Sequence, residues 1–225
     1  MAVAYDNDTQ ALNNTNVSSV TYSHTTAGSN RALAVFVALH GTGQTVSSIT
    51  YAGTALTVIG TITGATNQRL EAWGLAAAAT GANNVVVTLS ASNDGWDASA
   101  ISFTGANQTF GTCFTGVQSA NNGTGTSITN TVTTGQTNDV VVSGTCSSSG
   151  DGTAPGSGQT QQWLDNSGAS NTMGSTKAGA ASVAMVENWI NSPGTDGCSA
   201  IAVNIAQVSG GVVVTPHRGL MGAGV

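Results

Sequence analysis

The chain has 225 residues, of which only 6% are Asp, Glu, Lys or Arg, against about 25% in an average soluble domain. Its formal charge of -6 arises from 10 acidic and 4 basic residues, and the basic residues do not cluster. This balance argues against a nucleic-acid partner bound through its phosphates and against docking on an anionic membrane. We therefore expect neither nucleic acid nor a membrane as a partner.

Taken in chain order, residues 1–16 form an expected extended N-terminal segment, and strand signals begin after it. The signals are short runs rich in β-branched residues and bounded by Gly, Asn, Asp or Ser. They cover residues 17–22, 31–40, 46–51, 55–62, 69–75, 84–89, 98–103, 127–132, 139–145, 161–165, 180–187 and 200–207, with a last short run at 212–214. Residues 75–79 hold a run of alanines that predicts a one-turn helix or a loop.

The pattern predicts an all-β fold, an antiparallel two-sheet jelly-roll-like sandwich with extended terminal arms. Ile201, Val203 and Ile205 alternate with smaller residues and so share one face of a strand. Residues 46–51 and 56–59 flank a turn with Gly53 and predict a hairpin. No repeat of fixed period is visible, which argues against a propeller or a solenoid.

The predicted organisation is an N-terminal segment (1–16), a β-sandwich domain (17–210) and a C-terminal extended arm (211–225). The arm follows two glycines and carries apolar residues with little neighbouring structure to bury them. It packs on a neighbouring subunit or is a frayed terminus. In the first case its partner-binding residues are Val212, Val213, Val214, Pro216, Leu220, Met221 and Val225.

Catalytic signatures are not visible, and we expect no enzyme and no cofactor. His24, His40 and His217 are far apart in sequence and match no metal or catalytic spacing, so we interpret them as structural. The two glutamates, Glu71 and Glu187, lie in unlike contexts and do not predict a glycosidase pair. Cys113, Cys146 and Cys198 are either buried thiols or one disulfide and an orphan.

Oxygen-rich segments and tryptophans are two further features that could signal binding. Residues 6–9 and 93–97 offer clustered oxygens of the kind that bind Ca²⁺, although an ordinary turn is the preferred interpretation. Among the tryptophans, Trp73 and Trp163 are expected in the core. Trp96 lies in an apparent turn and is the candidate glycan contact, because exposed tryptophans stack on sugars.

Several segments resemble a β-sandwich module of bacteriophage virion proteins, in which similar domains serve as capsid decoration or cement proteins or are tail-associated. The segments are SHTT (23–26), NRALAV (30–35), ITYAGTAL (49–56), EAWGL (71–75), GANNVVV (81–87) and SFTG (102–105). The resemblance spans roughly residues 15–208. It implies a jelly-roll-like body without catalysis and supplies no active-site residues.

The leading hypothesis is a virion structural protein, a capsid decoration or cement protein that binds and stabilises the phage head shell. Its partners would be the major capsid protein and copies of itself, as a homo-oligomer on the particle. Residues 1–8 lack the basic and apolar regions of a Sec signal, so we expect assembly into the virion in the host cytoplasm. The alternative is a carbohydrate- or receptor-binding module on a tail fibre or cell surface.

Overall fold

The computed structural model describes residues 1–64, 67–122, 126–147, 153–166, 171–189 and 197–208. Within them the chain is almost entirely antiparallel β-structure, and the only helix is the four-residue α1 (Phe110–Cys113). The strands before α1 are β1 (Ala4–Asn14), β2 (Val17–Thr26), β3 (Ala32–His40), β4 (Val46–Tyr51), β5 (Thr54–Ala55), β6 (Thr57–Thr63), β7 (Gln68–Ala76), β8 (Gly81–Asn93) and β9 (Trp96–Thr104).

The strands after α1 form a second set. They are β10 (Phe114–Asn122), β11 (Ser127–Val132), β12 (Val140–Ser147), β13 (Thr153–Pro155), β14 (Thr160–Asp165), β15 (Asn171–Ala178), β16 (Val183–Trp189) and β17 (Cys198–Ile205). The all-β class and the antiparallel sandwich predicted from the sequence are thereby confirmed.

The first set builds a jelly roll. Its sheets run β1-β9-β3-β7-β6 and β2-β8-β4-β5, called here the first inner sheet and the first outer sheet. β5 and β6 are two parts of one strand interrupted at Leu56, of which β5 pairs with β4 and β6 with β7. When β5 and β6 are counted as one strand, the first set has eight strands. The first, eighth, third and sixth then lie side by side in the inner sheet, and the second, seventh, fourth and fifth in the outer sheet. This is the strand order of a jelly roll.

The second set repeats the same topology. The second inner sheet runs β10-β17-β12-β15-β14 and the second outer sheet β11-β16-β13, so each strand takes the place of its counterpart in the first set. The registers agree as well: Ala32 pairs with Phe103 and Ala76, and Val140 pairs with Ile205 and Ala178. The chain is therefore a tandem of two jelly rolls.

Two local irregularities recur at equivalent places and support the correspondence. The edge strand β6 has a bulge between Val58 and Gly60, opposite Trp73, and β14 has one between Gln161 and Trp163, opposite Ser175. Asn30 and Asn138 each precede a central strand by two residues, with φ of 53° and 78°. Asparagine tolerates this left-handed backbone better than most residues do.

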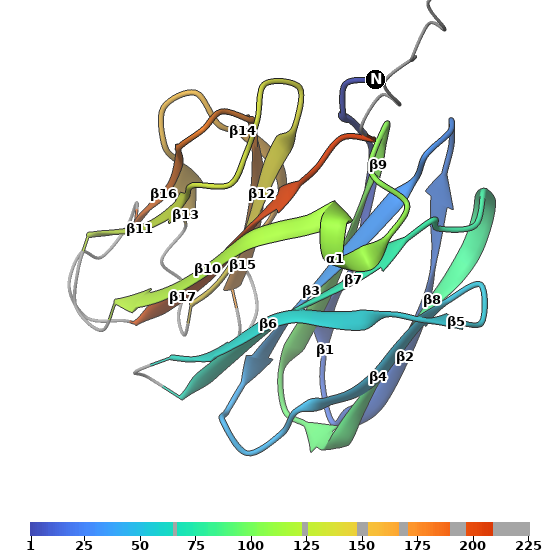
Figure 1. Cartoon of the computed structure of the whole chain (residues 1–225). Helices are drawn as coiled ribbons and strands as arrows, with labels where there is room; N and C mark the ends of the chain where they lie inside the picture. Colours follow the sequence, from blue (N-terminus) through green and yellow to red (C-terminus); the bar gives the residue numbers. More distant parts are fainter. Residues whose placement is uncertain (65–66, 123–125, 148–152, 167–170, 190–196, 209–225) are drawn as a thin grey trace, which may run out of the picture.

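The two jelly rolls pack through their inner sheets, which gives four layers in the order outer, inner, inner, outer (Figure 1). The central strands β3 and β12 contact each other, as do β6 with β10 and β1 with β14. Since β1 corresponds to β10 and β6 to β14, these contacts are reciprocal, as expected of a pseudo-twofold arrangement.

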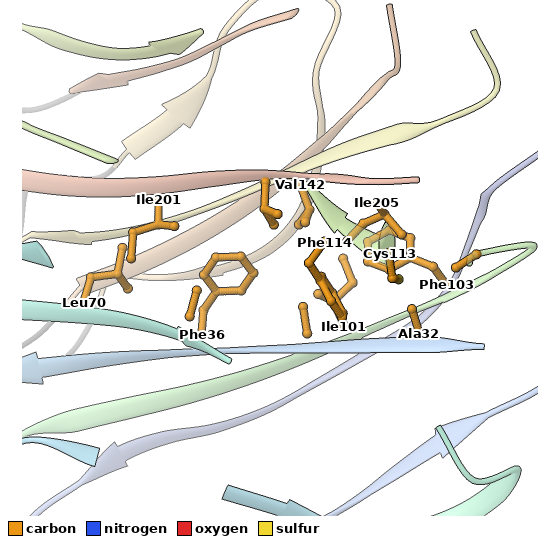
Figure 2. Close-up of a cluster of buried hydrophobic side chains, with 14 of the residues drawn as sticks. Ala32, Phe36, Leu70, Ile101, Phe103, Cys113, Phe114, Val142, Ile201 and Ile205 are labelled. Carbon is orange, nitrogen blue, oxygen red and sulfur yellow. The ribbon is translucent and has the colours of Figure 1, made fainter. Parts of the chain in front are cut away.

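The largest apolar cluster lies between the two inner sheets, where Phe36, Leu70 and Ile101 face Val142 and Ile201 (Figure 2). A close approach of the sheets is possible because Gly144 stands opposite Phe36: a Cβ at Gly144 would lie 2.4 Å from the Phe36 ring. Phe36 and Gly144 are equivalent residues of the two jelly rolls, so this contact lies near the pseudo-twofold axis.

The structure differs from the sequence-based organisation in two respects. Residues 1–16 are not a separate arm, because β1 pairs along β9 and forms an edge of the first inner sheet. The sandwich has four sheets rather than two among the described residues. Residues 75–79 form a strand end and a turn, with Ala77 at φ 58°, which agrees with the predicted loop and not with the one-turn helix. The hairpin around Gly53 is confirmed by the pairing of β4 with β5.

Candidate functional site

A hollow lies at one end of the first jelly roll, where four strand connections meet. It has a volume of about 440 Å³, which falls in the ~300–1,000 Å³ range of small-molecule sites. The lining comes from the β1–β2, β3–β4, β6–β7 and β8–β9 connections and the adjoining strand ends. It consists of Asn16, His40, Gly41, Thr42, Gly43, Gln44, Asn67, Ser92, Asn93 and Asp94, and we call it the loop-end pocket.

Asn93, which is 2% exposed, ties these connections together. Its Nδ2 donates to the His40 carbonyl oxygen at 2.7 Å and to Gln44 Oε1 at 3.3 Å, and its Oδ1 accepts from the Gly95 N–H at 2.9 Å. The Asn16 N–H donates to the backbone carbonyl oxygen of Asn93 at 2.7 Å. The buried Asn93 side chain thus uses both its amide nitrogen and its amide oxygen to hold the strand connections around the pocket.

The rim is shaped by left-handed backbone. Asn16 and Asn67 both have φ 56°, and Gly41 has φ 93°. The Gly41 N–H donates to the Asn67 carbonyl oxygen at 2.7 Å, which closes the β3–β4 connection onto the β6–β7 connection. These asparagines and this glycine supply the positive φ at low cost, and their side chains or bare backbone face the pocket.

Asp94 is the one carboxylate among the described residues that line the pocket. His40 Nδ1 lies 3.1 Å from Asp94 Oδ1, and this hydrogen bond lowers the pKa of the Asp94 carboxyl below its usual value. Because a carboxylate only accepts hydrogen bonds, Nδ1 of His40 carries the proton. The pocket therefore offers an ionised acceptor, several amides and hydroxyls, and no Lys or Arg side chain.

A second hollow of about 440 Å³ adjoins α1 and is lined mainly by threonines, glutamines and Asp139. Asp139 is 5% exposed and forms no salt bridge with a described residue. Its carboxylate accepts from the backbone N–H groups of Gln136 and Gln207, at 3.0 and 2.9 Å, and from Asn204 Nδ2 at 2.9 Å. Since these contacts hold the β11–β12 connection against the end of β17, we assign Asp139 a structural role.

Each jelly roll buries one glutamate. Glu71 accepts from Arg69 Nε at 2.6 Å, from Trp73 Nε1 at 3.1 Å and from the Val46 N–H at 3.1 Å. Glu187, by contrast, has only neutral donors such as Ser175 Oγ at 3.2 Å, and its Oε2 has no hydrogen-bond partner among the described residues. Burial raises the pKa of Glu187 to about 7.

The expectation that Trp96 is an exposed glycan contact is wrong. Trp96 is 1% exposed and lies in the core between the first inner and outer sheets, with Nε1 donating to the Val17 carbonyl oxygen at 3.2 Å. The apparent turn in the sequence is only two residues long, so β9 already begins at Trp96. Trp73 and Trp163 are buried as predicted.

The other sequence candidates have structural places or lie outside the described residues. His24 is buried beside Tyr51 and hydrogen-bonds Thr9 through Nδ1 at 3.1 Å, as expected of a structural histidine. His40 is likewise hydrogen-bonded, to Asp94, and it also lines the loop-end pocket. The seven arm residues between Val212 and Val225, together with His217, lie outside the described residues.

Oxygen-rich segments and cysteines were further candidates. Asn93 and Gly95 form the turn that was preferred over a Ca²⁺ loop, and no group of three His, Cys, Asp or Glu in the described ranges could hold a metal ion. None of the three cysteines forms a disulfide. Cys146 faces the first jelly roll and Cys198 faces the second outer sheet, so the two point to opposite sides of one sheet.

Sequence reasoning missed the loop-end pocket because its residues come from four separate connections. Asn16 and Asn67 carry no motif, and Asn93-Asp94-Gly95 is an ordinary turn sequence. The available signal was the placement of asparagine or glycine directly after or before predicted strands. Such residues mark loops, but only the sheet order tells which loops share an end of the sandwich.

Comparison with known protein families, with curated proteins and with solved structures finds no match to this chain. The resemblance to a phage virion module therefore rests on its sequence segments alone. In the part of the chain that the structure describes, no helix is long and apolar enough to cross a membrane.

Proposed function

We propose that the protein is a non-enzymatic virion structural protein, a decoration or cement protein of a phage head shell. One observation carries the proposal: the described strands of the two outer sheets present no charged side chain to the outside. Among the strands of the two outer sheets, Glu187 is the only Asp, Glu, Lys or Arg, and it is buried. Surfaces depleted in charge are typical of the centres of protein interfaces.

The first outer face is the more extensive one. Ser and Thr side chains of β2, β4 and β8 stand side by side on it, as in the row formed by Ser19, Thr88 and Ser48. Such a face has few charges to desolvate and fits a flat partner, and many copies on a regular shell would add their affinities. The proposed partners are the major capsid protein and neighbouring copies of this chain.

The C-terminal arm is a further proposed contact. Residues 211–225 hold the apolar candidates Val212, Leu220, Met221 and Val225, and an arm of this kind adds binding area without a larger fold. The N-terminal segment is not proposed as a second such arm, because β1 belongs to the first inner sheet.

The test is quantitative mass spectrometry of purified particles from the source system, scaled to the major capsid protein. A copy number comparable to that of the capsid subunit is expected. Absence from particles would overturn the proposal, and a handful of copies would place the protein at the tail. Rebinding of the chain lacking residues 212–225 to stripped particles then measures what the arm contributes.

A further inference from the structure

We infer that the loop-end pocket binds a neutral, hydroxyl-rich small ligand, a saccharide or related polyol, by direct hydrogen bonding. This site goes beyond the proposed structural role and does not depend on it. It also differs from the sequence-based alternative, which assigned sugar contact to the now buried Trp96.

The first argument is the number of polar groups that are still available. The side chains of Asn16, Asn67 and Ser92 line the pocket and make no hydrogen bond to the described part of the chain. Asp94 uses Oδ1 for His40, which leaves Oδ2 as an acceptor. Amides and carboxylates of this kind pair with neighbouring hydroxyl groups, because each offers two polar atoms about as far apart as two adjacent hydroxyls.

The second argument is preorganisation. The connections that carry these side chains are fixed by the buried Asn93 and by the backbone hydrogen bond from Gly41 to Asn67. A polar ligand of this size gains little from apolar burial, so its affinity depends on donors and acceptors that are already in place. A site on loops meets this condition only when the loops are tied together, as they are here.

The third argument is charge, which selects among polar ligands. No Lys or Arg is found among the described lining residues, and the ionised Asp94 disfavours phosphates and carboxylates. A bare metal ion is disfavoured because Asp94 is the only carboxylate in the lining. The lining also lacks aromatic rings other than the His40 imidazole, which favours a ligand held by hydrogen bonds over one held by stacking.

The experiment screens the full chain against an array of neutral mono- and oligosaccharides, then measures affinity for each hit by calorimetry with and without EDTA. The pocket variant Asn16→Gly/Asn67→Gly removes two amides yet keeps the left-handed backbone. Its matched control, Asn30→Gly/Asn138→Gly, makes the same change at two positive-φ asparagines outside the pocket. Asp94→Asn is a second variant that removes the charge without changing the shape.

The expected result is EDTA-insensitive binding that weakens about tenfold or more in the pocket variant and in Asp94→Asn, the loss that follows removal of such hydrogen bonds. The control should bind as the unmodified chain does. In the unmodified protein, the bound sugar should shift the NMR ring resonances of His40 and leave those of the buried His24 in place.

Three results would overturn the inference: no array hit that binds in solution, binding that is lost in EDTA, or a hit whose affinity is equal in the pocket and control variants. Particle association is measured separately, so failure here leaves the proposed structural role standing, and failure there leaves the sugar site standing.

Discussion

The two jelly rolls share one topology but fill their interiors differently. Between its sheets the first buries Val35, Val37, Leu39, Trp73 and Trp96. The equivalent positions of the second, read from the strand registers, are Ser143, Thr145, Ser147, Ser175 and Cys198, all of them buried. Because burying one large apolar side chain contributes about 1.5–3 kcal/mol, the second interior supplies much less hydrophobic stabilisation of its own.

This difference indicates that the second jelly roll depends on the first. Its inner sheet is covered on one face by the apolar cluster around Phe36, Val142 and Ile201, which is the largest in the molecule. Its own sandwich core is a small cluster that includes Val132, Val141 and Met185. A shared topology therefore tolerates a polar interior in one copy as long as the contact between the copies is apolar.

The largest expected effect comes from truncating the cores at equivalent positions. Trp96→Ala should cost about 3–5 kcal/mol of unfolding free energy, the usual range for a fully buried tryptophan, whereas Cys198→Ala should cost about 1 kcal/mol or less. Urea unfolding followed by circular dichroism measures both. Equal losses in the two variants would contradict the asymmetry of the cores.

The buried glutamates sharpen the comparison through pH. In the unfolded chain Glu187 titrates near its ordinary 4.5, but in the fold its pKa is about 7. Between these two pH values only the unfolded state loses the proton. The contribution of Glu187 to the free energy of unfolding therefore falls as pH rises from about 4.5 to 7, and it stays low above pH 7. Glu187→Gln should therefore stabilise the protein by up to about 3 kcal/mol at pH 8.

At pH 4 the gain from Glu187→Gln should nearly disappear, because the Glu187 carboxyl of the unmodified protein is then mostly neutral in both the folded and the unfolded state. The matched variant in the first jelly roll, Glu71→Gln, should destabilise at pH 8, since Arg69 then loses its carboxylate partner. Thermal unfolding of both variants at the two pH values checks the signs. Destabilisation by Glu187→Gln at pH 8 would show that its charge is better compensated than its neutral donors suggest.

The smallest effect concerns the contact between the jelly rolls. Gly144→Ala places a Cβ 2.4 Å from a Phe36 ring carbon, so ring and strand must shift, at a cost of about 1–3 kcal/mol. The control is Gly111→Ala, where a Cβ meets nothing within 4 Å. Urea midpoints of the two variants measure the difference, and an undiminished midpoint in Gly144→Ala would mean that the sheets are not held closely there.

Local patterns in the sequence were enough for the fold class and for many strands. Residues 46–51 and 127–132 were predicted with the bounds that the structure has, because β-branched residues and flanking turns mark them directly. Four strands were missed, all with weak local signals: β1 is rich in Asn and Asp, β15 contains glycine and lysine, β10 ends in two asparagines, and β13 has only three residues. All four owe their conformation to the neighbours with which they pair.

The duplication and the pocket were decided by tertiary structure alone. Trp73 and Ser175 occupy one position in two copies of the same topology, yet share no property that a sequence scan could match. Likewise, Asn16, Asn67 and Asp94 are brought to one pocket by the strand order, which local patterns do not encode. Strand propensity and composition are local properties, so they were sufficient to predict antiparallel sheets with few charged residues. Which sheets face each other, and which loops meet, depends on contacts between residues far apart in the chain.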